Sequence, residues 1–225
     1  MMTDVLPDAR AVAKQAASFI AEEARSAVAA RGRFLLALSG GKTPWKMLQA
    51  LAKESVPWAQ VHLFQVDERV SPEGHPDRNL TTLREILLTL TPLGEDHIHP
   101  MPVEEDDLEA GASHYAESLR SWGGTPPVLD LVHLGLGADG HTASLLPGDA
   151  VLSVTNRDVA PTGPYFGRQR MTLTFPMINR ARKILWLVTG VDKAPMLRRL
   201  LKADPTVPAG RIEQTNALLL TDTSI

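Results

Sequence analysis

The sequence FLLALSGGKTP, residues 34–44, runs from a short apolar segment through two glycines into the start of a helix. The segment Phe34–Leu38 is apolar at every position, as expected of a strand that is covered on both faces. Thr43 and Pro44 then predict a helix through Leu51, with Thr43 as its N-cap and Pro44 at the first position, which tolerates proline. A buried strand, a tight turn and a helix make one unit of a parallel α/β sheet.

The rest of the chain repeats this alternation of strand and helix. Apolar residues at helical spacing predict further helices over residues 12–31, 80–90, 108–122, 177–181 and 196–201. Short apolar runs predict strands over residues 61–66, 128–134, 170–175, 184–188 and 217–220. We therefore expect an α/β fold with a mostly parallel sheet and helices on both faces. Without a repeat or a long linker, residues 1–225 are expected to form one domain, with 147–167 as a surface loop.

The composition restricts the possible partners. Of the 225 residues, 44% are hydrophobic and 22% are charged, which is the usual mixture of a globular protein. The net charge of −3 gives no bulk attraction to nucleic acid or to an anionic membrane, so phosphate binding requires a local site. With no cysteine, the chain has no disulfide, thiolate nucleophile or Cys-ligated metal centre. It shows neither a secretory signal nor a membrane-spanning run, so we expect a cytoplasmic protein.

Candidate site residues follow the predicted strands, because open parallel sheets bind ligands beyond the carboxyl ends of their strands. After the first strand, Gly40 and Gly41 let the backbone approach a ligand, and the next helix offers free N–H groups to a phosphate. A purely structural turn is the alternative. A P-loop would need glycine where Leu36 stands, which excludes a nucleoside triphosphatase of that type.

Two cations stand at further strand ends. Arg69, in the triplet Asp67-Glu68-Arg69 after the second strand, has a side chain suited to pairing with phosphate. Lys193 lies at a predicted helix start, against the preference of the helix dipole, so an anionic ligand explains it better than helix stability does. In both cases a solvated surface charge is the alternative.

The segment after the third strand, GLGADGHTAS (135–144), contains both a glycine motif and a histidine. G-x-G-x-x-G is typical of dinucleotide binding, but Pro147-Gly148 leaves no room for the long helix that such a site requires. His141 is a candidate general base because imidazole titrates near neutrality, and Asp139 is close enough to orient its ring. His97 and His99 form only a weak metal signal, since no third ligand stands at a diagnostic spacing.

Together these segments resemble the family of 6-phosphogluconolactonases and glucosamine-6-phosphate deaminases/isomerases. The resemblance is carried, in order along the chain, by LALSGGKTP (36–44), QVDERVSP (65–72), LGLGADGHTASLLPG (134–148), RMTLTFPMINRAR (170–182) and LVTGVDKAPML (187–197). The third segment is similar to the lactonase branch, because the deaminases continue differently after the histidine. The family commonly has Ser-Asn where this chain has Arg78-Asn79, and Phe where it has Leu146.

This resemblance implies a three-layer Rossmann-like sandwich that hydrolyses 6-phospho-D-glucono-1,5-lactone to 6-phosphogluconate without a metal or organic cofactor. It implies that His141, with Asp139 beside it, is the general base. The residues implied to bind the phosphate and sugar are Ser39, Gly40, Gly41, Thr43, Asp67, Arg69 and Lys193. Backbone N–H groups between Gly137 and Gly140 are candidate donors to the oxyanion. Asn79 and Arg170 remain without a role.

Two alternatives stay open. One is an aminosugar-phosphate deaminase or isomerase on the same fold, and the other is a phosphosugar-binding module in which His141 is incidental. In each case the expected partner is a small sugar phosphate and not a nucleic acid or a membrane. We expect a monomer or a weak homo-oligomer.

Overall fold

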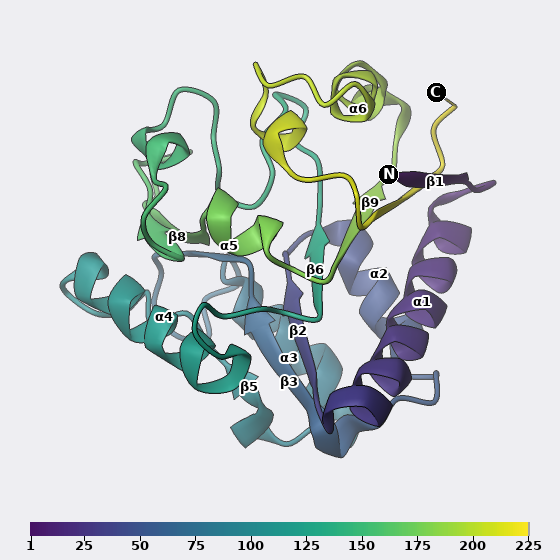
Figure 1. Ribbon diagram of the computed structural model, residues 1–225, viewed down its shortest axis with the longest axis horizontal. Helices are drawn as coiled ribbons and strands as arrows, with labels where there is room; N and C mark the ends of the chain where they lie inside the picture. Colours follow the sequence, from purple (N-terminus) through teal and green to yellow (C-terminus); the bar gives the residue numbers. More distant parts are fainter. Residues whose placement is uncertain (225) are drawn as a thin grey trace.

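The computed structural model describes residues 1–224, and its centre is a sheet of seven parallel strands (Figure 1). Across the sheet the strands follow the order β1 (Met2–Val5), β10 (Ala217–Thr221), β9 (Lys183–Val188), β6 (Leu131–Leu134), β2 (Phe34–Leu38), β3 (Val61–Gln65) and β5 (Ile98–His99). The helices are α1 (Ala9–Arg31), α2 (Lys42–Leu51), α3 (Asn79–Leu90), α4 (Leu108–Gly123), α5 (Phe175–Asn179) and α6 (Ala194–Leu201). Short 3₁₀ turns are η1 (Trp58–Gln60), η2 (Glu95–His97), η3 (Ala150–Ser153), η4 (Val191–Lys193) and η5 (Pro208–Arg211).

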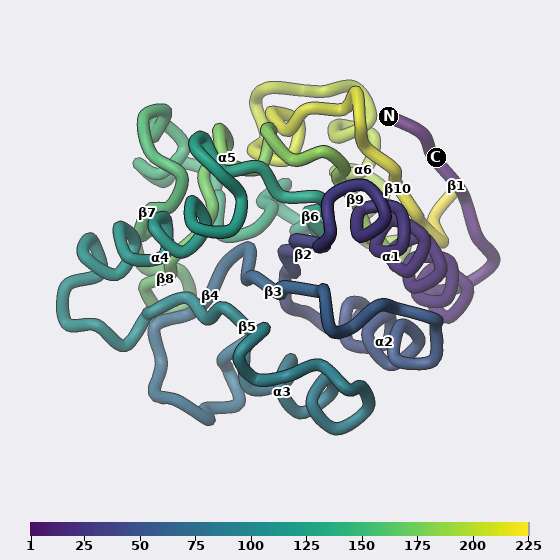
Figure 2. Tube along the Cα trace, turned by 60° about the horizontal axis from the view of Figure 1, so that its bottom comes forward, coloured from purple at the N-terminus to yellow at the C-terminus, as the bar shows by residue number. Residues whose placement is uncertain are grey.

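Helices cover both faces of this sheet, as the sequence predicted. One core contains the buried sides of α1, α2 and α3, and a second core contains those of α4, α5 and α6. Figure 1 shows α1 and α2 on one side of the sheet and α4 on the other, and Figure 2 separates α2 and α3 from α4 and α5. Successive residues of β2 pack into alternate cores. Leu36 and Leu38 belong to the first core, and Leu35 and Ala37 belong to the second. This double burial explains why the central strands are mostly apolar. The polar exceptions, His62 and Gln65 of β3 and His133 of β6, are buried as well.

The longest helix shows how local sequence sets an element's limits. Asp8 caps α1 by accepting hydrogen bonds from the N–H groups of Arg10 and Ala11, both at 2.8 Å. The helix ends at Arg31. The next residue, Gly32, has a φ of +74°, which suits the left-handed position that follows a helix.

The order of the strands places a crevice at one point in the sheet. From β2 the chain moves outward through β3 to β5, then returns to place β6 on the other side of β2 and continues to β9 and β10. The direction of winding therefore reverses between β2 and β6. In open α/β sheets, such a switch point separates the loops that follow the two strands and forms the usual ligand site.

A second, antiparallel sheet was not predicted. It consists of β4 (Asp67–Arg69), β8 (Arg170–Leu173) and β7 (Val159–Pro161) in that order. Residues 170–175 were expected in the main sheet, and residues 147–167 as a surface loop. Both expectations were wrong in part. β8 pairs with β4, and the expected surface loop itself contributes η3, β7 and the buried residues Val151, Val159 and Ala160.

Some boundaries also differ from the prediction. β6 begins at Leu131 instead of residue 128, and the edge strands β1 and β5 had no apolar pattern to reveal them. Within the part of the chain that the structure describes, no helix combines the length and apolar character needed to cross a bilayer.

Candidate active site

The loops that follow β2, β6 and β9 meet around one hollow at the switch point. Its volume is about 240 Å³, and its lining consists of Ser39, Gly40, Gly135, Leu136, Gly137, His141, Ala143 and Lys193. Five residues that the sequence singled out, Ser39, Gly40, Gly137, His141 and Lys193, therefore come together here. The other predicted site residues, Gly41, Thr43, Asp67, Arg69 and Asp139, are not part of this lining.

His141 and Asp139 form a hydrogen-bonded pair beside this hollow. The His141 Nδ1 atom lies 2.5 Å from Asp139 Oδ1, which also accepts the backbone N–H of His141 at 3.1 Å. Burial tends to raise the pKa of Asp139, but the His141 backbone N–H and the nearby imidazole outweigh it and hold this pKa below its ordinary value. The carboxylate therefore stays charged and orients the ring. Among residues 1–224, the Nε2 atom of His141 has no hydrogen-bond partner.

The loop that carries His141 depends on glycine. A Cβ atom on Gly137 would lie 2.1 Å from His141 Nδ1, so only glycine lets the imidazole approach the backbone so closely. The Gly137 N–H donates to the His141 carbonyl (2.8 Å), and the Gly140 N–H donates to the Gly137 carbonyl (3.1 Å). These two N–H groups are used within the loop and are not free to bind an oxyanion, so of the predicted donors between Gly137 and Gly140 only those of residues 138 and 139 remain as candidates.

The turn after β2 presents unused backbone donors. Gly41 has a φ of +130° and stands directly before α2. Within the described residues, the N–H groups of Gly40 and Gly41 have no hydrogen-bond acceptor, so the turn can accommodate an anion as the sequence suggested. Ser39 fastens the turn to β6, because its hydroxyl donates to the His133 carbonyl at 3.1 Å.

Thr43 was predicted to cap α2, and this was wrong. The helix begins at Lys42, two residues before the predicted first position at Pro44. Among the described residues, no side chain caps it. The Thr43 hydroxyl instead forms a 2.7 Å hydrogen bond with the hydroxyl of Thr189, at the end of β9. It therefore links two of the segments that surround the hollow.

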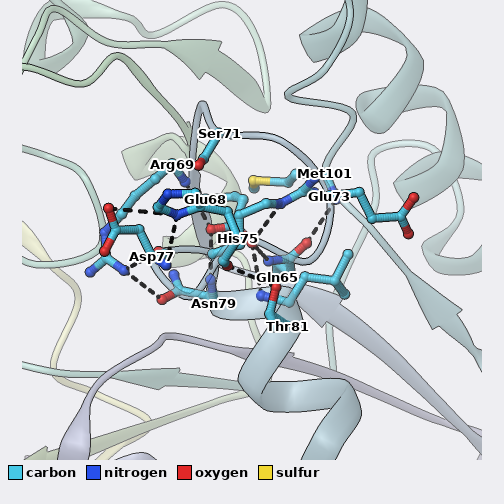
Figure 3. A network of polar contacts seen from close by, with 12 residues as sticks. Gln65, Glu68, Arg69, Ser71, Glu73, His75, Asp77, Asn79, Thr81 and Met101 are labelled. Carbon is cyan, nitrogen blue, oxygen red and sulfur yellow. Dashed lines mark hydrogen bonds and ion pairs between the residues drawn. The ribbon is translucent and has the colours of Figure 1, made fainter.

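Glu68 organises the segment after β3 (Figure 3). Its carboxylate is fully buried and accepts the N–H groups of Arg69 (2.8 Å), Asn79 (2.9 Å) and Leu80 (2.9 Å). The Gln65 side-chain amide donates a further hydrogen bond at 2.6 Å. Because Asn79 and Leu80 open α3, Glu68 satisfies N–H groups that would otherwise lack partners at the helix start. Glu68 is thus a buried cap of α3 and not a solvated charge.

Asn79, which the sequence left without a role, joins two parts of the site. Its side-chain oxygen accepts from Arg69 Nη1 at 3.3 Å, and its nitrogen donates to the Asp67 carbonyl at 3.1 Å. A Cβ atom on Gly40 would lie only 1.9 Å from the same side-chain oxygen. Asn79 therefore supports Arg69 and also packs against the glycine turn. Arg69 donates further to the Asp77 carbonyl at 2.6 Å.

Asp67 and Arg170 lie deeper in the small sheet. Asp67 is buried and accepts from the Ser144 hydroxyl at 2.6 Å, so it does not line the hollow. Arg170 stands opposite Arg69 in the β4–β8 pair and is also buried, with no partner for its Nε atom among residues 1–224. Burial, followed by the charge of Arg69, lowers the pKa of the Arg170 guanidinium, while Asp67 opposes this shift.

Lys193 approaches the hollow from η4. Its Nζ atom lies 3.5 Å from a carboxylate oxygen of Asp192. The turn before it is held from the other end of the chain, because Asp222 accepts the Gly190 N–H at 2.8 Å and Thr223 donates to the Gly190 carbonyl at 3.0 Å. No residue pattern indicated these two anchors, because they reach Gly190 only in the folded chain.

The remaining histidines lie elsewhere. His62 stacks against both His97 and His99, and His62 and His99 also contact the Trp122 ring. The His62 Nδ1 atom lies 3.1 Å from His99 Nε2. No group of three or more His, Cys, Asp or Glu side chains in the described part of the chain has the arrangement of a metal site. Burial, then the charge of His97, lowers the pKa of both His62 and His99 to about 4.

Comparisons with known proteins agree with the fold and the motifs. Residues 7–221 match the family model described as glucosamine-6-phosphate isomerases/6-phosphogluconolactonase. A 6-phosphogluconolactonase from a Synechocystis species is 37% identical over 96% of this chain and 92% of its own length.

Solved structures share the architecture. A 6-phosphogluconolactonase from Shewanella baltica superposes with a TM-score of 0.86 at 29% identity, covering 100% of this chain and 98% of the other. A monomeric glucosamine-6-phosphate deaminase reaches a TM-score of 0.84 at 19% identity, over 98% of this chain and 97% of its own, which shows the fold alone.

Proposed function

We propose a function from the premise that this chain belongs to the glucosamine-6-phosphate isomerase/6-phosphogluconolactonase family: it hydrolyses 6-phospho-D-glucono-1,5-lactone to 6-phospho-D-gluconate, the second step of the oxidative pentose phosphate pathway. The observation that supports it most directly is the orientation of His141. One ring nitrogen is bound by Asp139, while the other is unpaired on a ring that lines the same hollow as Lys193.

The proposed reaction begins with neutral His141. Its Nε2 atom accepts a proton from water as the water oxygen attacks C1 of the lactone, which yields a tetrahedral oxyanion and an imidazolium. The imidazolium then returns this proton to the ring oxygen as the C1–O bond breaks. Asp139 stabilises the transient positive charge and holds the ring in place. A lactone is an activated ester, so the reaction requires no covalent nucleophile.

The phosphate serves as a handle that is remote from C1. Its proposed partners are Lys193, Arg69 and the unused N–H groups of Gly40 and Gly41 at the start of α2. Binding energy from this handle holds C1 next to His141 and so lowers the entropic part of the barrier.

A pH-stat assay with freshly prepared 6-phosphogluconolactone tests the proposal, because hydrolysis releases a proton. We expect rapid proton release that exceeds spontaneous hydrolysis. Parallel incubation with glucosamine 6-phosphate measures ammonia and identifies a deaminase instead. Binding of 6-phosphogluconate without turnover of either substrate would indicate a phosphosugar-binding module and would contradict the proposed activity.

A further inference from the structure

A tight hairpin turn over residues 165–168 lies beside the Asp139–His141 pair. The Tyr165 N–H donates to the Arg168 carbonyl at 2.9 Å, and the Arg168 N–H donates back at 3.3 Å. The central residues Phe166 and Gly167 have φ angles of +49° and +74°, as two-residue hairpins require. Phenylalanine is poorly suited to this conformation, and Phe166 is 88% exposed, so core packing does not compensate for the strain. Phe166 therefore has an unfavourable backbone conformation in the turn that positions Tyr165.

That neighbour, Tyr165, contacts both members of the pair. Its hydroxyl donates to Asp139 Oδ2 at 3.3 Å, while the other carboxylate oxygen faces His141 Nδ1 at 2.5 Å. The Tyr165 and His141 rings meet edge to face with their centroids 5.7 Å apart. The Arg170 guanidinium lies 5.0 Å from the centroid of the tyrosine ring and supports it from β8.

We propose that Tyr165 is a positioning residue for the Asp139–His141 pair. By binding the second carboxylate oxygen, its hydroxyl fixes the carboxylate plane and so directs the imidazole. The consequence for turnover rests on the proposed function, whereas the hydrogen bond and its effect on His141 do not.

The hydroxyl also sets how strongly Asp139 attracts a proton to His141. Burial, then the negative charge of Asp139, raise the pKa of Tyr165, so the hydroxyl keeps its proton and donates it to the carboxylate. A donor on Oδ2 withdraws negative charge from the carboxylate and weakens its attraction for an imidazolium. The other charged groups around His141 are Lys193 of η4, which lines the same hollow, and Arg170 beyond the tyrosine ring.

The test replaces the hydroxyl alone, with Tyr165→Phe. NMR titration of His141 in the substrate-free protein should give a midpoint above that of wild type, because the carboxylate regains its full charge. The acid limb of the kcat/KM profile for lactone hydrolysis should move to higher pH by the same amount. We expect kcat to fall about fivefold, the usual net contribution of one ordinary hydrogen bond, with KM within twofold of wild type.

Phe166→Asn is the matched control, since asparagine suits the left-handed turn and the Tyr165 hydroxyl is retained. It should leave the His141 titration and the pH profile unchanged. The proposal is overturned if Tyr165→Phe titrates like wild type, or if Phe166→Asn shifts His141 equally, because the turn and not the hydroxyl would then be responsible. If the protein hydrolyses no lactone, the proposed function fails while the NMR titration still decides the role of Tyr165.

Discussion

His141 and Lys193 line the same hollow but are expected to contribute at different stages of the reaction. His141→Ala should lower kcat by about 10²–10⁴-fold, the usual contribution of a general base, and His141→Asn should behave alike. Affinity for 6-phosphogluconate, measured by calorimetry, should change little because the phosphate handle is intact. His114→Ala, at an exposed histidine on α4, is the control and should retain full activity. A folded His141→Ala protein with near-wild-type kcat would remove His141 from the mechanism.

Lys193→Ala should affect the binding of substrate, whereas His141→Ala should affect kcat. Without the cation, KM for 6-phosphogluconolactone should rise by about tenfold or more, as expected for loss of a charge-assisted contact to phosphate. Hydrolysis of unphosphorylated gluconolactone should change much less. Steady-state kinetics with both substrates measures the difference, and Lys202→Ala at the end of α6 controls for loss of surface charge. An equal loss on both substrates would place Lys193 at the reacting carbon.

Sequence reasoning at this scale found residues that carry their chemistry in their type and in their position after a strand. His141, Lys193 and Gly40 are of this kind. It missed Glu68 as a cap because a charged residue after an apolar run normally faces solvent, whereas here the start of α3 folds back onto it. It also left Tyr165 unmentioned, because only the hairpin turn brings this residue to Asp139.

At the scale of elements, the packing of the β2–α2 turn against α3 is open to a direct test. Gly40→Ala places a Cβ atom 1.9 Å from the Asn79 side-chain oxygen and should lower the free energy of unfolding by about 1–3 kcal/mol. Combining it with Asn79→Ala should cost less than the sum of the two single changes, because the clash is gone.

Urea denaturation measures both effects. Gly135→Ala is the matched control for stability, since a Cβ atom there meets nothing within 4 Å. Strictly additive losses in the double variant would show that a Cβ atom at residue 40 does not clash with the Asn79 side chain.

The two sheets differed in how well the sequence revealed them. The central strands of the main sheet are buried on both faces, so a mostly apolar run identified each of them, although β3 and β6 also contain buried histidine. The small sheet is built from three- and four-residue strands, one of which is Asp67–Arg69 and contains only charged residues. These short strands are stabilised by pairing and leave no local periodicity; β4 and its partner β8 lie about a hundred residues apart in the chain.

For the whole molecule, neutral histidines make stability depend on pH. Burial lowers the pKa of His133 to about 3, and those of His62 and His99 fall to about 4 for the same reason. The unfolded chain takes up these protons near pH 6.5, whereas the folded chain does not, so stability is full above pH 6.5 and falls progressively toward pH 4. Urea midpoints at pH 7.5, 5.5 and 4.5 should decrease in that order.

In the His62→Gln variant, the side chain at residue 62 cannot take up a proton. Its free energy of unfolding should therefore fall less between pH 7.5 and 4.5 than that of the wild type. A midpoint that is independent of pH in the wild type would contradict the burial of neutral histidines.

The place of β10 in the main sheet has a consequence for the making of the protein. Although β10 comes late in the chain, it lies between β1 and β9 as an internal strand. A nascent polypeptide that has left the ribosome only as far as residue 216 has an unfilled gap in its sheet, and the anchors Asp222 and Thr223 have not yet reached the turn before Lys193. We therefore expect the complete sheet and the turn before Lys193 to form only after residues 217–223 have been synthesised, with premature termination before residue 217 yielding a product that proteases remove.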